Sequence, residues 1–373
     1  MNAKKLGFGL MRLPTNTPGD RADIDMDQLC RMVDTFIGRG FTYFDTAWMY
    51  CGFASEPAAR AAIVDRYPRE SFTLATKLHY SYINTPSDRD AIFFSQLEKT
   101  GAGFFDYYLL HDIGGSGYNV YERLDCFDWI MRKKEQGLVR KIGFSFHDTP
   151  QLLDHVLTKY PFMDFVQLQI NYLDWDHLAI QSRLCYETAV RHGKPVVVME
   201  PCKGGTLAQV PPQVEEHFRA YAPGMSIPSW ALRFAASLDN VMMVLSGMST
   251  LAQVEDNTSY MQDFRPLTEQ ERRLCLDAAA LINSTIAIPC TGCSYCTDGC
   301  PMDIAIPQYF ALYNNDLKEI KHGHTTSQRN YYNRISTVHG KASDCIQCGQ
   351  CESICPQHLH IIDELKTVAE RFE

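Results

Sequence analysis

Short apolar segments alternate with amphipathic stretches along the first 265 residues of the chain. The apolar segments are five or six residues long, which predicts β-strands at residues 6–11, 41–45, 72–77, 107–111, 141–145, 165–169, 196–200 and 242–246. The spacing of apolar residues between them predicts helices near residues 24–39, 55–66, 88–101, 121–136, 150–159, 178–192, 227–237 and 250–261. Gly40 marks the end of the first helix, whose apolar face consists of Met26, Leu29, Val33, Phe36 and Ile37.

The predicted strands are mostly continuous apolar runs, which is typical of parallel strands buried on both faces. Eight strand–helix pairs indicate an α/β fold, a (β/α)8 TIM barrel. A doubly wound open sheet is the alternative, but that fold typically has a glycine-rich phosphate-binding turn after its first strand, and none is present. We therefore expect a barrel over residues 1–265, a linker helix over 266–285 and a second domain over 286–373. One connection, residues 202–226, is oversized and is predicted to be a loop that shapes the barrel's site.

Four polar residues stand at or just after the ends of three consecutive predicted strands: Asp45, Tyr50, Lys77 and His111. Catalytic groups of such barrels lie at the carboxyl ends of the strands. Any one of these residues alone would be ordinary, since a strand-end Asp is often a helix cap and a lone Tyr is often packing. Together they indicate an acid for a carbonyl oxygen, because an ammonium lowers the pKa of a nearby phenol. We expect Asp45 to pair with Lys77, and Lys77 to lower the pKa of Tyr50. His111 would orient the carbonyl.

Two copies of the run C-x2-C-x2-C-x3-C-P lie near the C-terminus, at Cys290, Cys293, Cys296 and Cys300, and at Cys345, Cys348, Cys351 and Cys355. This run holds 4Fe–4S clusters in bacterial ferredoxins, and its fourth cysteine ligates the other cluster. The predicted ligand sets are therefore Cys290, Cys293, Cys296 and Cys355, and Cys345, Cys348, Cys351 and Cys300. Structural zinc and disulfides fit this spacing poorly. Helical patches between the runs, at residues 301–344, predict an enlarged, mainly α-helical ferredoxin-like domain that docks on the barrel.

Composition narrows the functional classes further. With 45% hydrophobic and 21% charged residues, the chain is typical of a globular enzyme. A net charge of −9 argues against nucleic-acid binding. The sequence has neither an apolar run long enough for a transmembrane helix nor the pattern of a signal peptide at its N-terminus. We expect a cytoplasmic protein that acts on a small molecule.

The segments around the four polar residues resemble the aldo-keto reductase family. They read Phe-Asp45-Thr-Ala-Trp-Met-Tyr50, Ala-Thr-Lys77 and Leu-Leu-His111, and Lys-Ile-Gly-Phe-Ser145 follows. With the cysteine runs, the whole chain resembles the subgroup that carries a C-terminal domain with two 4Fe–4S clusters. The resemblance implies that the Asp/Tyr/Lys/His tetrad reduces carbonyls with a hydride from NADP(H) or NAD(H) bound across the barrel mouth. It further implies cofactor contacts from Asp45, Gly9, Met11, Ser145, Gln167, Gly247, Ser249, Gln253 and Asn257.

Three positions depart from the family's pattern. Phe146 follows Ser145 where many members have Asn, and Met199 stands where an aromatic residue often stacks on the nicotinamide. Gly247 and Gln253 replace the cations that grip the 2′-phosphate of NADP. Two cations elsewhere, Lys203 and Arg233, are the candidates to supply that charge.

The sequence leaves three functional hypotheses. The first is an NAD(P)-linked oxidoreductase that reduces a carbonyl or oxidises an alcohol. The second arises because a hydride carries two electrons and each cluster accepts one, so a flavin or another acceptor would split the pair; an external electron carrier is then a natural partner. The third is a redox-sensing or partner-binding module on the same barrel.

Overall fold

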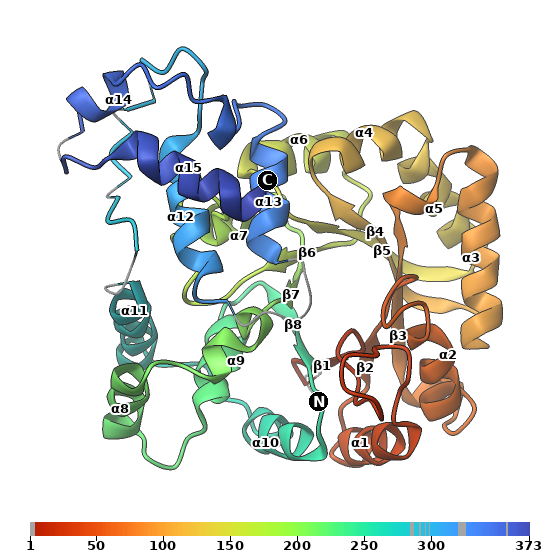
Figure 1. Cartoon of the computed structure of the whole chain (residues 1–373). Coiled ribbons are helices and arrows are strands. Elements are labelled where there is room, and N and C mark those ends of the chain that lie inside the picture. Colours follow the sequence, from red (N-terminus) through yellow and green to blue (C-terminus); the bar gives the residue numbers. More distant parts are fainter. Residues whose placement is uncertain are drawn as a thin grey trace.

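Eight parallel strands close into a barrel in the order β1-β2-β3-β4-β5-β6-β7-β8, as the apolar runs predict (Figure 1). The computed structural model describes residues 4–283, 287–290, 292–294, 296–297, 299–319, 326–355 and 357–373. The strands are β1 (Leu6–Gly9), β2 (Tyr43–Asp45), β3 (Thr73–His79), β4 (Phe105–Ile113), β5 (Val139–Phe146), β6 (Phe165–Gln169), β7 (Val196–Met199) and β8 (Val241–Gly247). All eight predicted strands are confirmed, and only their ends differ.

The inside of the barrel is filled by side chains from alternating strand positions. This inner core consists of Tyr43, Ala75, Leu109, Phe165, Val197, Met243 and Leu245. Gly143 on β5 makes room for one of them, because a Cβ at this position would lie 2.6 Å from the ring and the carbonyl oxygen of Phe165. The barrel is thus a packed core, and only the ends of its strands are open to ligands.

Helices surround the barrel and bury its outer face. They are α1 (Met26–Gly38), α2 (Ser55–Ala59), the π-helix η1 (Arg60–Val64), α3 (Pro86–Thr100), α4 (Gly115–Arg123), α5 (Cys126–Glu135), α6 (Pro150–Lys159), α7 (Ser182–Arg191), α8 (Pro212–Tyr221), α9 (Ile227–Ala236) and α10 (Leu251–Met261). Short 3-10 turns are η2 (Arg69–Ser71), η3 (Tyr80–Tyr82) and η4 (Lys203–Ala208). The predicted helix at 121–136 is interrupted at Asp125, which has a φ of 52°.

Two further differences concern segments near the end of the barrel. The connection 202–226 is a turn followed by the helix α8, not an open loop, and Pro212 begins that helix where a missing N–H costs nothing. The helix α11 (Glu269–Asn283) packs on the barrel, since its buried residues Cys275, Ala278 and Ile282 belong to the barrel's outer core. Residues 284–285 of the predicted linker helix lie outside the described residues.

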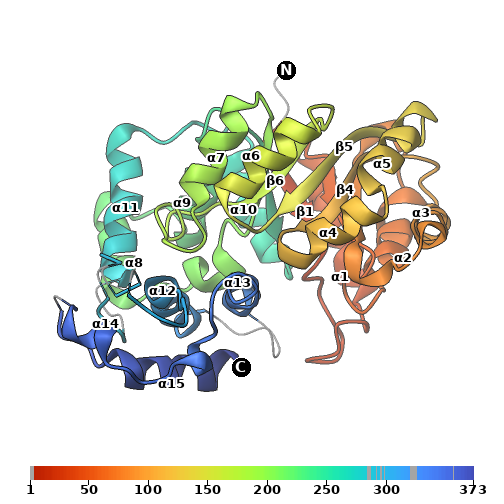
Figure 2. The same cartoon turned by 90° about the horizontal axis from the view of Figure 1, so that it is seen from above.

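The C-terminal part is helical, as expected, and has a core of its own. Its elements are α12 (Ile306–Asp316), α13 (Ser327–Ile335), η5 (Ala342–Asp344), α14 (Gln350–Ser353) and α15 (Ile361–Phe372). Tyr309, Phe310 and Tyr332 are central in that core, together with buried faces of α15. Figure 2 shows α12 and α13 lying between the barrel and α15. Among the described residues, no helix combines the length and apolar character needed to cross a bilayer.

Candidate functional site

A buried ion pair lies at the carboxyl ends of β2 and β3. Lys77 has no exposed surface, and its Nζ donates to Asp45 Oδ1 at 2.5 Å and to the carbonyl oxygen of Thr46 at 2.8 Å. Burial lowers the pKa of Lys77 and raises that of Asp45, while the attraction between them opposes both shifts. Asp45 Oδ2 is buried without a hydrogen-bond partner. The pairing expected from the sequence is therefore present.

Tyr50 and His111 lie beside this pair. Lys77 Nζ is 4.9 Å from the centroid of the Tyr50 ring, and the rings of Tyr50 and His111 meet edge to face with centroids 5.8 Å apart. Burial, and then the charge of Asp45, raise the pKa of Tyr50 well above its ordinary value. We expected Lys77 to lower the pKa of Tyr50, and in this structure that prediction is wrong. Burial and the Lys77 charge hold the pKa of His111 well below its usual range. The phenol is protonated and the imidazole neutral at pH 7.

The predicted nicotinamide-binding residues lie on neighbouring strands. Ser145 on β5 and Gln167 on β6 are paired in the sheet and both are buried. Gln167 Nε2 donates to Met199 Sδ at 3.4 Å, but Gln167 Oε1 has no partner. Ser145 Oγ accepts a hydrogen bond from a backbone N–H of β4 at 2.7 Å. Buried acceptors without partners call for a ligand, so the unsatisfied oxygen of Gln167 fits the amide group of a carboxamide.

The residues predicted to contact the adenosine end gather where β1, β8 and α10 meet. Gly9 pairs with both Asp45 and Gly247 in the barrel, and Met11 is 40% exposed just beyond β1. The backbone N–H of Ser249 donates to Gln253 Oε1 at 2.7 Å, and the Gln253 side chain, with Thr250, caps the start of α10.

Asn257 differs from its neighbours in being buried beneath the surface. Its Nδ2 donates to Ser246 Oγ at 2.9 Å, and its Oδ1 accepts from the Tyr260 hydroxyl at 2.6 Å. Both polar atoms of Asn257 are thus engaged within the protein.

Arg12 is a cation at this edge that sequence reasoning missed. Its side chain lies over Gly247 and its Nη1 donates to the carbonyl oxygen of Gly204 at 2.9 Å. Its guanidinium is 3.6 Å from Glu200. The two cations proposed from the sequence are committed elsewhere. Lys203 is buried against Asp174 at 2.6 Å, and Arg233 pairs with Glu271 of α11 at 3.0 Å. The position of Arg12, directly after Met11, was the available signal.

A second cluster that the sequence did not indicate surrounds Asp112, the residue after His111. Arg334 of α13 donates to the Asp112 carboxylate and to the carbonyl oxygen of His147. His79 Nε2 is 3.9 Å from the same carboxylate. Burial opposes ionisation of Asp112, but His147 and the Arg334 guanidinium outweigh it and hold the pKa of that carboxyl well below its usual range. The C-terminal domain thereby reaches the residues beside the tetrad.

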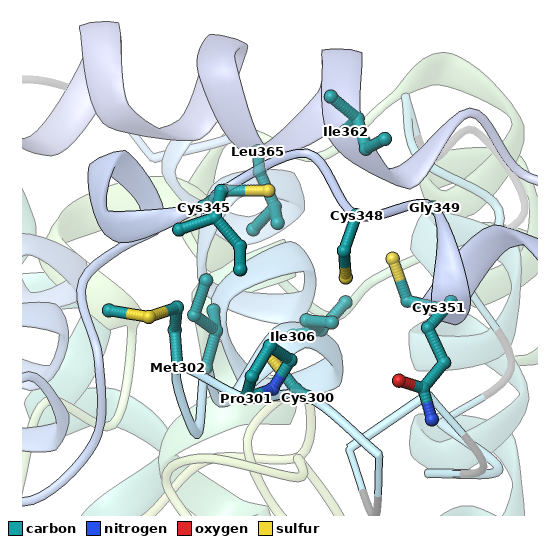
Figure 3. Close-up of a pocket in the computed structure, with 13 residues that line it drawn as sticks. Cys300, Pro301, Met302, Ile306, Cys345, Cys348, Gly349, Cys351, Ile362 and Leu365 are labelled. Carbon is teal, nitrogen blue, oxygen red and sulfur yellow. The ribbon is translucent and has the colours of Figure 1, made fainter.

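The eight cysteines of the two runs surround two pockets of about 330 Å³ each. One is lined by Cys300, Cys345, Cys348 and Cys351, and the other by Cys290, Cys293, Cys296 and Cys355. In Figure 3 the sulfurs of Cys345, Cys348 and Cys351 point toward one central space, with Cys300 on its opposite side. The structure therefore groups the cysteines as the motif predicts. The fourth cysteine of each run, Cys300 or Cys355, lines the pocket formed by the other run. Pro356 lies outside the described residues.

The chemistry of these pockets fits an iron–sulfur cluster. Among the described residues, no three His, Cys, Asp or Glu side chains converge closely enough to hold a single metal ion. The remaining lining of both pockets is apolar or uncharged, and Ile306 lines both. Burial raises the pKa of the Cys296 thiol to about 12 and that of Cys351 to about 11. The positive charge needed to keep these sulfurs as thiolates would come from the iron itself.

Comparison with known proteins agrees with both parts of the chain. The model of the aldo/keto reductase family matches residues 5–278, and that of the 4Fe-4S dicluster domain matches residues 289–360. A solved aldo-keto reductase from Bacillus halodurans in its holo form is 22% identical, with a TM-score of 0.58, and the match covers 74% of this chain and 91% of that one. A comparison with the curated proteins gave no match.

Two further solved structures share the barrel. An aldo-keto reductase from Klebsiella pneumoniae in complex with NADPH is 18% identical, with a TM-score of 0.56, covering 74% of this chain and 96% of that one. An aldose reductase from Giardia lamblia is 20% identical, with a TM-score of 0.55, covering 75% and 93%. At these identities the likeness concerns the fold.

Proposed function

Because the chain belongs to the aldo-keto reductase family and carries a 4Fe-4S dicluster domain, we propose that this oxidoreductase reduces a carbonyl, or oxidises the matching alcohol, with NADP(H) or NAD(H). The observation that carries the proposal is the series of contacts from the buried pair Asp45 and Lys77 to the half-buried Tyr50 and His111. Bound at Ser145 and Gln167, the cofactor would supply a hydride to the carbonyl carbon.

The roles of the four residues follow from their environments. Tyr50 donates its proton to the carbonyl oxygen, and its raised pKa keeps that proton in place until the substrate binds. The phenolate that forms is stabilised by Lys77 at 4.9 Å from the ring centroid. Asp45 holds Lys77 in position through their hydrogen bond. His111 is neutral and can donate a hydrogen bond that orients the carbonyl.

The substitution Tyr50→Phe tests this assignment. It should lower kcat by about 10²- to 10⁴-fold, because it removes the proton donor and little else. The dissociation constant of NADPH, measured by fluorescence titration, should stay within about twofold of the wild type. Tyr107→Phe, at the half-buried Tyr107 of the barrel interior, is the matched control and should leave kcat unchanged. A kcat equal to that of the wild type in the Tyr50→Phe variant would show that Tyr50 is not the proton donor.

We assign the recognition of the cofactor's phosphates to Arg12. It lies over Gly247 beside Ser249, whose Oγ donates to the Arg12 carbonyl oxygen at 2.7 Å. A bidentate guanidinium suits phosphate oxygens, and a bound phosphate would compete with the 3.6 Å pair with Glu200 and with the hydrogen bond to the Gly204 carbonyl oxygen. Arg12→Ala should raise the dissociation constant of NADPH about tenfold. If the group held is the 2′-phosphate, NADH binding should change less. Equal binding of both nucleotides by wild type and variant would refute the assignment.

Electron transfer between the barrel and the clusters is a second candidate activity. It is favoured by the contact between Arg334 of the C-terminal domain and Asp112 beside the tetrad, while Ile306 lines both cluster pockets and brings these two pockets close together. A flavin or an external electron carrier would divide the hydride's two electrons. The test is an anaerobic titration with NADPH, and separately with NADH, in which EPR measures the reduction of the clusters. Reduced clusters would mean that the barrel and the clusters form one redox chain. Clusters that stay oxidised despite nucleotide binding would mean either that an external electron carrier reduces them or that the barrel works without them. A cytoplasmic location belongs to the same proposal, since cluster thiols persist where thiols stay reduced.

A further inference from the structure

The C-terminal domain places one side chain beside the barrel's tetrad. Arg334 is the eighth residue of the helix α13 and comes from the segment between the two cysteine runs. Its side chain is only 13% exposed, and Tyr331, one turn earlier, is buried with its ring 6.1 Å from that of His147. The helix α13 therefore packs on the end of β4 and on His147, which directly follows β5.

The residue that Arg334 binds has an unusual backbone. The ladder between β4 and β5 shifts register between Leu110 and Ile113, so His111 and Asp112 fall within an irregularity of the sheet. Asp112 has a φ of 67°, in the left-handed region that costs a non-glycine residue on the order of 1 kcal/mol. Such irregularities re-aim side chains and persist only where the surroundings hold them.

Two contacts hold Asp112 in this conformation. Its N–H donates to Ser145 Oγ at 2.7 Å, and its carboxylate accepts from Arg334. These contacts fix the peptide that follows His111 and, at the same time, the hydroxyl of Ser145. Of the two, only the Arg334 contact comes from outside the barrel.

The charges make the contact with Arg334 costly to lose. The Asp112 carboxylate is 20% exposed and lies near three histidines, His79, His111 and His147, that burial keeps neutral at pH 7. An ion pair broken on one side leaves a buried charge uncompensated. Without the guanidinium, Asp112 would be expected to turn toward solvent or to take up a proton, and in either case its backbone would no longer be held.

We propose that Arg334 is a positioning residue of the barrel's active site, which acts through Asp112 on His111 and Ser145. The cluster domain then completes the catalytic geometry of the barrel, in addition to any electron transfer. This inference rests on the carbonyl-reducing function proposed above, in which His111 orients the carbonyl and Ser145 holds the nicotinamide.

The test compares Arg334→Ala with Arg334→Lys, and Arg329→Ala is the matched control. Arg329 lies on the same helix and is half-buried, but its guanidinium donates to the carbonyl oxygen of Glu373, within the C-terminal domain. Arg334→Ala should lower kcat about 10- to 100-fold with the KM for the carbonyl substrate changed much less, because displacement of a positioned group acts on the transition state. Arg334→Lys should recover part of the loss, and Arg329→Ala should match the wild type. Iron content should be full in all three.

A second readout does not depend on activity. Hydrogen exchange of the amides in residues 111–117 should be about tenfold faster in Arg334→Ala than in Arg329→Ala, because the segment is released locally. Equal kinetics and equal exchange in both variants would overturn the inference. If the wild-type protein reduces no carbonyl while exchange still differs, the proposed function fails and the positioning contact stands. If Arg334→Ala does not fold, the kinetics and hydrogen exchange of Arg334→Lys and Asp112→Asn are compared with those of Arg329→Ala instead.

Discussion

The barrel site and the cluster pockets prepare for their ligands in opposite ways. At the barrel mouth, buried charges are already paired within the protein, as Lys77 and Asp45 are at 2.5 Å. In the cluster pockets, the lining consists of thiols and apolar or uncharged side chains, and burial raises the pKa of Cys296 and Cys351. A preorganised polar site retains its geometry without its ligand, whereas a thiol pocket depends on the metal for its charge balance.

The largest expected effect comes from breaking the paired charge. Lys77→Met leaves Asp45 buried and unpaired, which should lower the free energy of unfolding by about 3–5 kcal/mol and lower kcat by at least about 10²-fold. The double variant Asp45→Asn, Lys77→Met should regain much of the stability but none of the activity. Urea unfolding and steady-state kinetics measure the two effects.

The matched control for this experiment is Lys133→Met. Lys133 is also a buried lysine, paired with Asp90 at 2.6 Å on the outer side of the barrel. Asp90 is 43% exposed, so its charge stays solvated and the loss should be smaller. Equal losses of stability and activity in both variants would show that the tetrad's pair has no special role.

Removal of one cluster ligand tests the other side of the comparison. Cys351→Ala takes a buried sulfur from one pocket only, so iron and labile sulfide should fall by about half while the cluster at Cys290, Cys293, Cys296 and Cys355 remains. The barrel, with its charges already paired, should keep its NADPH dissociation constant. Cys30→Ala, which changes a cysteine outside both pockets, should retain all the iron. Full iron in Cys351→Ala would contradict the ligand sets.

The smallest effect concerns pH. Burial lowers the pKa of His79 and of His147 to about 4, against about 6.5 in the unfolded chain. Between these values the unfolded state binds more protons, so the free energy of unfolding should fall as pH drops from about 6.5 to 4, by about 2–3 kcal/mol per histidine. His147→Gln should flatten this dependence in anaerobic urea titrations. His155→Gln, at an exposed position of α6, should leave it as it is.

Features fixed by local register or spacing could be predicted from the sequence. The eight strands follow from continuous apolar runs, and Asp45, Lys77 and His111 fall near strand ends because the strands place them there. The grouping of the cysteines follows from the spacing of the run. The helix α8 was missed because its prolines indicated a loop, although Pro212 is also a helix-starting residue.

Features that depend on burial or on contacts distant in sequence could not be predicted. The raised pKa of Tyr50 follows first from burial, which a reading of neighbouring charges overlooks. The contact of Arg334 with Asp112 joins residues 222 positions apart on two different domains. Arg12 carries no periodic signal, and its position beside Gly247, Gly204 and Glu200 emerges only when β1, β7 and β8 are brought together.

The helix α12 sets a length scale for the whole molecule. It begins at Ile306, between the two cluster pockets, and the residues just beyond its end approach the barrel, where Glu319 lies close to Gly204. Its 11 residues span about 16 Å. If electrons pass between the barrel and the clusters, as proposed above, the length of α12 would limit their rate, since tunnelling weakens exponentially with separation. Because α12 begins beside both pockets, the positive end of its dipole would favour the more negative, reduced state of a cluster bound there.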